Sequence, residues 1–216
     1  MIPAQMKAAV YRGRGKVVVE TVPVPAISAG EALVQVAACG VCHTDLKKVE
    51  HGLQEPPRIY GHEMAGTIVA LGRGVKGWKI GDRVAVFHHI PCGRCFYCDR
   101  QDYAQCPVYK KTGSTAGFEP AGGGFAEYLR VLPWIVKGGM VKVPKGVPLE
   151  NASFLEPVNT CLKGVDRLRL RKGDVVPVFG QGPIGLLFTQ LLKARKAKPV
   201  GLDLIPSRLS LSTNLA

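Results

Sequence analysis

The sequence predicts a mixed fold, in which a barrel-like, mainly β domain at residues 1–150 precedes an incomplete α/β domain at residues 151–216. The first observation is a series of short strand-like runs, separated by turns, from Lys7 to about Val143. The second is a change near Leu149, after which helical and strand-like segments alternate. The 26 glycines and 16 prolines supply the many turns that such a β domain needs.

Five runs in the first domain have the composition of strands and are predicted as such: residues 7–11, 17–20, 31–37, 64–70 and 83–87. Turns rich in glycine and proline separate them, for example at residues 12–15 and 23–25. One or two short helices are expected within this domain, and residues 42–49 are the best candidate.

The second domain contains a single β-α-β-α run, preceded by helical pieces at residues 148–164. Its predicted elements are a strand at 174–179, a helix at 183–194, a strand at 199–203 and the start of a helix at 206–215. Pro177 is unfavourable inside the first of these strands, because proline removes a backbone hydrogen-bond donor.

The chain carries 29 Lys and Arg against 16 Asp and Glu, a formal net charge of +13. The positive residues are scattered, and the densest groups lie at residues 167–172 and 193–198. Because a binding motif and interleaved aromatic residues are both missing, no nucleic-acid partner is expected. Without a secretory signal or a run of about 18 apolar residues, the chain is expected to be cytoplasmic, with no membrane contact.

Four of the seven cysteines are closely spaced, in the pattern Cys92-x2-Cys95-x2-Cys98-x7-Cys106. Four thiolates this close together can reach one tetrahedral zinc ion at about 2.3 Å per bond. An odd number of cysteines argues against a disulfide framework. Because four sulfur ligands leave no open position, this zinc is predicted to be structural; an iron–sulfur cluster and free thiols are the alternatives.

A second group of metal-ligating residue types is spread along the chain, at Cys42, His62 and Glu156. A Cys, a His and a carboxylate leave one position of a four-coordinate zinc open, as catalysis requires. Each residue alone is also typical of a core position or a turn. Cys39 and Cys42 form a CxxC pair, which also occurs at redox sites.

A glycine-rich segment, Gly180-Gln-Gly-Pro-Ile-Gly185, follows a predicted strand and opens a predicted helix. Such glycines let the backbone approach a pyrophosphate at the helix N-terminus. Asp203, at the end of the next strand, would accept hydrogen bonds from ribose hydroxyls and repel a 2′-phosphate. The segment therefore predicts an NAD site, with NAD favoured over NADP; a plain glycine turn is the alternative.

Together these motifs resemble those of zinc-containing medium-chain alcohol dehydrogenases, which join a GroES-like catalytic domain to a Rossmann domain. Five motifs match in order: Cys42-His-Thr-Asp45, Gly61-His-Glu63, Gly81-Asp-Arg-Val84, the four-cysteine loop and Gly123-Gly-Phe-Ala-Glu-Tyr128. The resemblance covers essentially the whole chain. It implies a zinc-dependent oxidoreductase that transfers a hydride between an alcohol and NAD, and Glu156-Pro157 is similar to the polyol and threonine dehydrogenases.

The resemblance also implies roles for individual residues. The implied ligands of the catalytic zinc are Cys42, His62, Glu156 and, as a neighbour or transient ligand, Glu63. Asp45 would orient His62, and Thr44 would accept the proton of the alcohol. Lys47 stands where family members often carry the His that ends the proton relay, so the relay beyond Thr44 is left open.

The residues that the resemblance implies for NAD binding are His43, Thr160, Gly180, Gly182, Pro183, Ile184, Gly185 and Asp203. It further implies two zinc ions per chain, an alcohol or polyol substrate, and a homo-dimer or homo-tetramer for full-length relatives. Such relatives continue for more than a hundred residues beyond this point. We therefore expect a fragment, an abbreviated product or a chain that needs a partner, which binds two zinc ions but NAD only weakly.

Two other classes of protein stay open. One is a non-catalytic, zinc-stabilised GroES-like module with weak or no NAD binding, and the other is a nucleic-acid-binding zinc protein. His51, His88 and His89 are assigned to the surface or to packing in the barrel rather than to a metal. Cys39 and Cys161 are predicted to be buried small residues.

Overall fold

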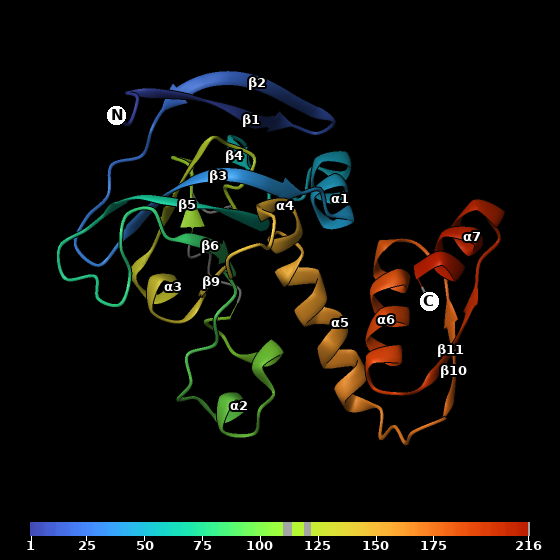
Figure 1. Ribbon diagram of the computed structural model, residues 1–216. Coiled ribbons are helices and arrows are strands. Elements are labelled where there is room, and N and C mark those ends of the chain that lie inside the picture. The colour runs from blue at the N-terminus through green and yellow to red at the C-terminus, as the bar shows by residue number, and fades with distance from the viewer. Residues whose placement is uncertain (110–113, 119–121, 216) are drawn as a thin grey trace. The chain divides into compact units, whose positions relative to one another are not determined.

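The computed structural model describes residues 1–109, 114–118 and 122–215, and the chain divides into two compact units (Figure 1). The first unit runs from Met1 to Leu155 and the second from Glu156 to Ala216. The first is built from antiparallel strands and short helices, whereas the second alternates strands and helices. The predicted class, mixed β followed by α/β, is therefore confirmed.

The first unit contains a three-stranded antiparallel sheet in the order β2-β1-β4. The strands are β1 (Gln5–Gly13), β2 (Lys16–Pro23) and β4 (Arg58–Ile59). A tight turn joins β1 to β2, and Gly15 in this turn has a φ of 70°, a left-handed conformation that glycine adopts without a steric penalty.

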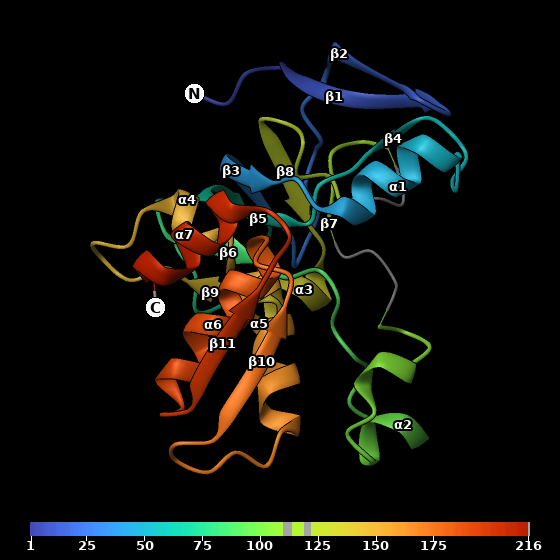
Figure 2. The same cartoon turned by 90° about the vertical axis from the view of Figure 1, so that its right-hand side faces the viewer.

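A six-stranded antiparallel sheet forms the centre of the first unit (Figures 1 and 2). In sheet order its strands are β7 (Ser114–Thr115), β8 (Tyr128–Val131), β3 (Ala32–Gly40), β5 (Glu63–Leu71), β6 (Arg83–Val86) and β9 (Met140–Lys142). The pairing of β3 with β5 has irregularities at Leu33/Val34 and Val36/Ala38, which bend the sheet. Only glycine fits at Gly66 in β5, because a Cβ there would lie 2.1 Å from the Gln35 carbonyl oxygen.

The main hydrophobic core packs against this sheet. Its fully buried side chains include Val34, Met64, Ile68, Val84 and Leu129, together with Ile135 from α3 (Pro133–Gly138). Burying one such side chain contributes about 1.5–3 kcal/mol. This core fixes the end of β3, two residues before Cys42, and the start of β5, where His62 and Glu63 lie.

The first unit contains more helices than the one or two expected. The predicted helix is present as α1 (His43–His51), and α4 (Leu149–Ala152) lies within the helical pieces predicted at residues 148–164, but α2 (Phe96–Asp99), α3 and the 3-10 helix η1 (Tyr103–Gln105) also occur. Apart from α1 these helices span three to six residues. That is too short to show the helical periodicity of apolar residues on which the expectation depends.

The second unit contains the elements that the sequence predicts. They are α5 (Leu155–Arg167), β10 (Val175–Phe179), α6 (Pro183–Ala194), β11 (Lys198–Leu202) and α7 (Pro206–Leu215). β10 and β11 pair in parallel. Pro177 lies inside β10 opposite Val200, and it is tolerated because β10 has a single sheet neighbour among the described residues.

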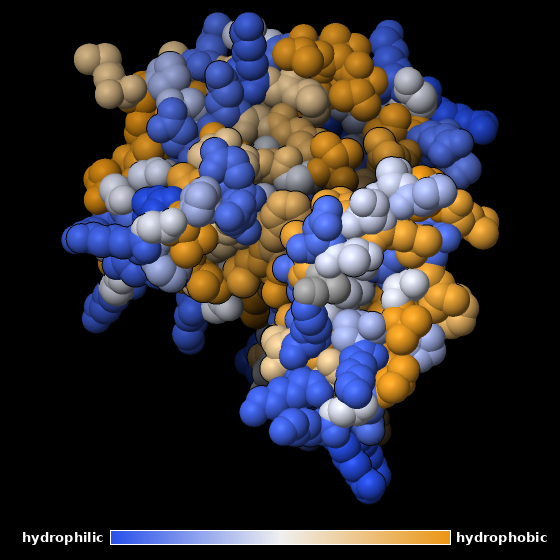
Figure 3. All heavy atoms as spheres, turned by 45° about the vertical axis from the view of Figure 1, so that its right-hand side comes forward, coloured by the Kyte–Doolittle hydropathy of each residue, from blue (hydrophilic) through white to orange (hydrophobic). Residues whose placement is uncertain are grey.

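The two basic groups of the second unit lie together, although they are separate in sequence. The Gly173 amide donates to the Lys196 carbonyl, and the Lys198 amide donates to the Asp174 carbonyl, which joins the two loops. In Figure 3 hydrophilic side chains gather at the lower end of the second unit.

No helix within the described residues combines the length and the apolar composition that a membrane span needs.

Candidate metal and nucleotide sites

The four-cysteine loop brings its sulfur atoms together. The Sγ atoms of Cys92, Cys95, Cys98 and Cys106 all lie within 4.8 Å of one another. The short helix α2 begins after Cys95 and places Cys98 one turn further on, where its Sγ lies 3.6 Å from that of Cys95. The Cys92 and Cys98 Sγ atoms are 3.9 Å apart.

These separations fit a single tetrahedral ion. Bonds of about 2.3 Å to a tetrahedral centre place the sulfur atoms about 3.8 Å apart. A disulfide needs about 2.05 Å, and none of the cysteines forms one. The Cys92 amide donates to Cys106 Sγ over 3.3 Å, and this hydrogen bond is the largest cause that lowers the pKa of Cys106 to about 6. The donor set and its spacing therefore fit zinc.

A second group of donor atoms lies where α1 begins. The ligand atoms of Cys42, His62 and Glu63 are within 4.8 Å of one another. Cys42 is the N-cap of α1, and its Sγ accepts a hydrogen bond from the Thr44 amide over 3.4 Å. A helix N-terminus stabilises the thiolate that binds metal. The structure thus brings together the predicted ligands Cys42 and His62 with Glu63, which was expected as a neighbour or transient ligand.

Asp45 connects the helix cap to the histidine. It is 3% exposed, and its Oδ2 accepts from the Cys42 amide over 3.2 Å. Its Oδ1 lies 3.3 Å from Nδ1 of His62, an ion-pair distance, and makes no well-formed hydrogen bond. A carboxylate at Nδ1 leaves Nε2 of His62 for a metal, as in many zinc sites. These residues therefore also fit a zinc ion.

The other predicted catalytic residues lie on α1 and α5. His43, Thr44 and Lys47 are exposed on α1, and Lys47 lies three residues after Thr44, so the two are neighbours on the helix surface. Glu156 lies in the first turn of α5 in the second unit. Thr160 follows one turn later on the same side of that helix.

The histidines outside the ligand group differ in environment. His51 is exposed, whereas His88 is 4% exposed and packs edge-to-face against His62, with ring centroids 5.9 Å apart. His89 lies 4.0 Å from His88 and stacks on Tyr109. Burial is the largest cause that holds the pKa of His88 well below its usual value, and His89, His62 and Lys48 lower it further.

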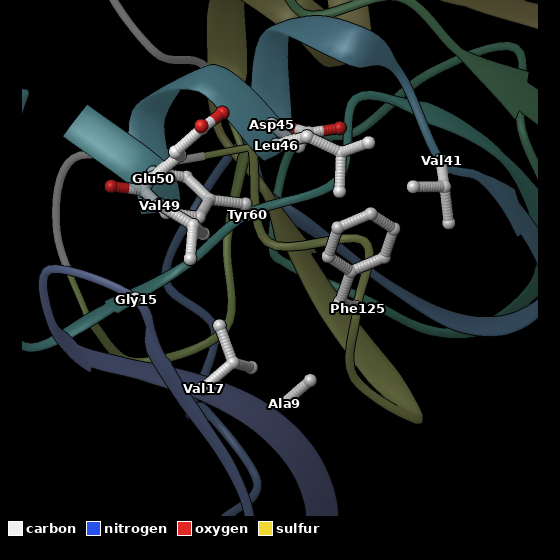
Figure 4. A pocket seen from close by; sticks show the side chains of 10 residues that line it. All are labelled: Ala9, Gly15, Val17, Val41, Asp45, Leu46, Val49, Glu50, Tyr60 and Phe125. Atoms are coloured by element: carbon white, nitrogen blue, oxygen red, sulfur yellow. The ribbon is translucent and has the colours of Figure 1, made fainter. Parts of the chain in front are cut away.

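An apolar cavity of about 470 Å³ lies beside α1, and the sequence analysis does not predict it. Figure 4 shows Leu46 and Val49 of α1 facing Val17 of β2 and the ring of Phe125 across this space. Asp45 also contributes to its wall. The helix that Cys42 caps therefore has a loosely filled apolar side.

The glycine-rich turn of the second unit connects β10 to α6. Gly180 has a φ of 88°, which favours glycine. A Cβ at Gly185 would lie 1.8 Å from the Gly180 carbonyl oxygen, so the turn closes tightly on the helix. Gly182 is the N-cap of α6, and a Cβ there would have no neighbour within 4 Å. The turn is therefore closely packed at Gly185 and has free space at Gly182. Such free space is what the approach of a phosphate to the backbone at a helix N-terminus requires.

Asp203 lies directly after β11 at one end of an open cavity of about 660 Å³. Its carboxylate accepts from the Gln181 amide over 2.6 Å and from the Ile205 amide over 2.8 Å, and these hydrogen bonds lower the pKa of Asp203. Arg208 on α7 lies 3.7 Å away. The sequence analysis did not single out Arg208, although it stands five residues after Asp203.

Gln181, between the first two glycines, is also a residue that sequence reasoning missed. It is completely buried, and its side-chain amide donates to the Val178 carbonyl over 3.0 Å. Its Oε1 accepts from Thr189 over 3.1 Å and from Ser212 over 2.7 Å. The side chain therefore joins the turn to both α6 and α7. Each hydrogen-bonding partner left unsatisfied would lower the free energy of unfolding by about 1–3 kcal/mol.

Replacing Asp45 by asparagine should weaken zinc binding at the Cys42 group by about 10–100-fold, because the carboxylate that orients His62 is lost. Asparagine retains an oxygen for the Cys42 amide, so the helix cap survives. Competition with a zinc chelator measures the affinity. Asp82→Asn is the matched control, because Asp82 is equally buried but pairs with Lys142. Equal zinc affinity in the two variants would contradict the role of Asp45.

Comparison with known proteins supports this assignment of motifs. Residues 28–145 match the family described as "Alcohol dehydrogenase GroES-like domain". The chain is 35% identical to sorbitol dehydrogenase of Bacillus subtilis over 214 residues, which are 96% of this chain and 58% of that protein. It is 38% identical to L-threonine 3-dehydrogenase of Pyrococcus horikoshii over 193 residues, which are 87% of this chain and 52% of that protein.

A solved structure shares the fold of both units. It is a putative zinc-binding dehydrogenase from Sinorhizobium meliloti 1021 bound to NADP, with a TM-score of 0.87 and 30% sequence identity. The match covers 99% of this chain and 60% of that one, so the chain spans somewhat more than half the length of the relatives it matches. By its motifs, its fold and this family match, the chain belongs to the zinc-binding alcohol dehydrogenases with a GroES-like domain.

Proposed function

We propose that the protein is a zinc-dependent oxidoreductase that transfers a hydride between an alcohol or polyol and NAD. The observation that carries this proposal is the pair of donor groups within one unit, a closed four-sulfur set and a separate Cys–His–carboxylate set. The first suits a structural zinc and the second suits a zinc with an open position. The names of the relatives, sorbitol and threonine dehydrogenases, support the substrate class.

Cys42 and His62 would hold the catalytic zinc together with Glu156, and Glu63 would be a neighbour or transient ligand. Zinc bound there would act as a Lewis acid that lowers the pKa of an alcohol hydroxyl. Thr44 would accept the hydroxyl proton, and its exposed position on α1 supports this role. Beyond Thr44 the proton would leave through Lys47, one helical turn away, or through water.

The second unit would hold the nicotinamide cofactor, which accepts the hydride. The turn from Gly180 to Gly185, with Gly182, Pro183 and Ile184, would bind the pyrophosphate at the N-terminus of α6. Asp203 would bind the adenosine ribose and favour NAD over NADP, while His43 and Thr160 would lie near the rest of the cofactor. With two strands in the nucleotide unit, we expect NAD to bind weakly.

Metal analysis and turnover of the 216-residue chain test the proposal. We expect two zinc ions per chain, one of which is lost on Cys42→Ser, and slow NADH formation with polyols at millimolar NAD. Two zinc ions without NADH formation would favour the non-catalytic zinc-stabilised module. One zinc ion, retained in Cys42→Ser, would contradict a catalytic zinc site, and micromolar NAD affinity would contradict weak cofactor binding.

A further inference from the structure

The two basic groups of the second unit form one positive surface, which we call the basic end. Its members, all exposed, are Arg167, Arg169, Arg171, Lys172, Lys193, Arg195, Lys196 and Lys198. An ion pair between Asp166 and Arg195 ties the end of α5 to the end of α6. Backbone hydrogen bonds from Gly173 to Lys196 and from Lys198 to Asp174 join the loops that lead into β10 and β11. Cations that the sequence keeps apart therefore share one surface.

The charge of the basic end is not neutralised within the second unit. Its eight cations are accompanied by two carboxylates, Asp166 and Asp174, so the surplus of six is almost half of the chain's net charge of +13. Among the described residues, Arg195 is the one member that pairs with a carboxylate. Complementing the helix dipoles accounts for Arg167 and Lys193, but the other six members lie beyond the helices. Such a surplus attracts an anionic partner.

The basic end does not serve the glycine turn of the same unit. Lys172 precedes β10 and Lys198 begins β11, whereas Gly180 and Asp203 follow the ends of these strands. At about 3.3 Å per residue, the five residues of each strand span about 16 Å. The cations are therefore too far from the turn to bind the pyrophosphate, and a partner on the basic end leaves the turn accessible.

Exposed apolar side chains among the cations favour one kind of anionic partner. Leu168, 46% exposed, lies between Arg167 and Arg169, and Val175, 65% exposed, follows the next loop. The surface of a lipid bilayer takes up apolar side chains while Lys and Arg contact its phosphates. A nucleic acid would leave these side chains in water, and neither basic group contains an aromatic residue that could stack on a base.

We propose that the basic end binds the anionic headgroups at the surface of a phospholipid bilayer, with Leu168 inserted among them. Each Lys or Arg near an anionic bilayer strengthens binding by about fivefold, and salt screens the attraction. An expectation of no membrane contact follows from the lack of a spanning run, but a contact at the surface needs none. The inference goes beyond the proposed function and is independent of it, because neither the zinc sites nor the nucleotide site takes part.

Sedimentation of the zinc-loaded 216-residue chain with lipid vesicles tests the inference. The vesicles contain phosphatidylcholine alone or phosphatidylcholine mixed with phosphatidylserine. We expect the chain to sediment with the anionic vesicles at low ionic strength, to dissociate as salt is added, and to stay in solution with the neutral vesicles. Equal binding to both kinds of vesicle, or no binding to either at low ionic strength, would overturn the inference and leave the dehydrogenase proposal intact.

Removing two charges from the basic end should weaken binding to the anionic vesicles by about 25-fold. The variant combines Lys172→Ala with Lys196→Gly. Lys196 has a φ of 62°, a conformation that glycine adopts without strain, so the variant should be at least as stable as the wild type. Lys16→Ala with Lys145→Ala removes two exposed lysines of the first unit and is the matched control. An equal loss in the control would show that net charge alone governs binding.

Leu168→Ser distinguishes a lipid surface from other polyanions. It keeps every charge but removes the exposed apolar side chain, so binding to anionic vesicles should fall by about 3–10-fold. Binding to heparin, a polyanion without an apolar layer, should stay the same. Unchanged vesicle binding in Leu168→Ser would show that the basic end recognises negative charge alone, as on a nucleic acid, and would overturn the lipid surface as its partner.

Discussion

Replacing Cys98 by serine should remove one zinc ion per chain and unfold the loop from Cys92 to Cys106. Cys98 is 6% exposed, and its Sγ lies within 4 Å of those of two other cysteines. The loop presents Phe96 to solvent, 62% exposed, and has little apolar contact to hold it. Structural zinc contributes about 10–16 kcal/mol in small zinc-dependent folds, so its loss leaves the loop without a dominant stabilising interaction.

Zinc content by elemental analysis and limited proteolysis between residues 92 and 106 measure this effect. Cys161→Ala is the matched control, because Cys161 is also fully buried but lies outside the sulfur group. It should retain both zinc ions and an intact loop. Unchanged zinc content and unchanged cleavage in Cys98→Ser would show that the four sulfur atoms do not hold an ion.

Replacing Gly185 by alanine should destabilise the second unit by about 3 kcal/mol or more, because the new Cβ would lie 1.8 Å from the Gly180 carbonyl oxygen. The carbonyl oxygen belongs to the backbone and the position of the Cβ is set by the backbone, so a change of rotamer cannot relieve the overlap. We expect amide hydrogen exchange in β10 and β11 to accelerate, while the zinc content of the first unit stays unchanged.

Gly182→Ala is the control for this substitution. A Cβ at that position meets no atom within 4 Å, and its φ of −73° is open to any residue. Its effect on stability should stay within about 0.5 kcal/mol. Equal exchange rates in the two variants would contradict the close approach of α6 to the turn. A loss of nucleotide binding in Gly182→Ala alone would instead mark the open side of the turn.

The elements with clear periodicity or spacing were predictable, and those held by distant contacts were not. The helix at Pro183–Ala194 was predictable because a glycine turn precedes an apolar segment of helical length. β4 has two residues and forms by pairing with β1, so no local pattern marks it. Helices of four to six residues, such as α2 and α3, are too short for periodicity to identify.

The same distinction applies to the candidate sites. The four cysteines share one loop, so their spacing alone predicted that their sulfur atoms would meet. The proximity of His88 to His62 depends on how β5 and β6 pair, and the sequence does not show it. Glu63 was expected as a neighbour of the ligands, and the register of β3 and β5, which pairs Gly40 with Glu63, places its carboxylate beside them.

The hydrogen bonds of Gln181 link the glycine turn mechanically to the last described helix. Ser212 is the one buried residue of α7 within the described range, and it donates to Gln181 Oε1. Little apolar contact therefore fixes this helix, and a directional bond to the turn sets its orientation instead. A substitution that breaks the Gln181–Ser212 hydrogen bond should therefore loosen α7 without unpairing β10 from β11.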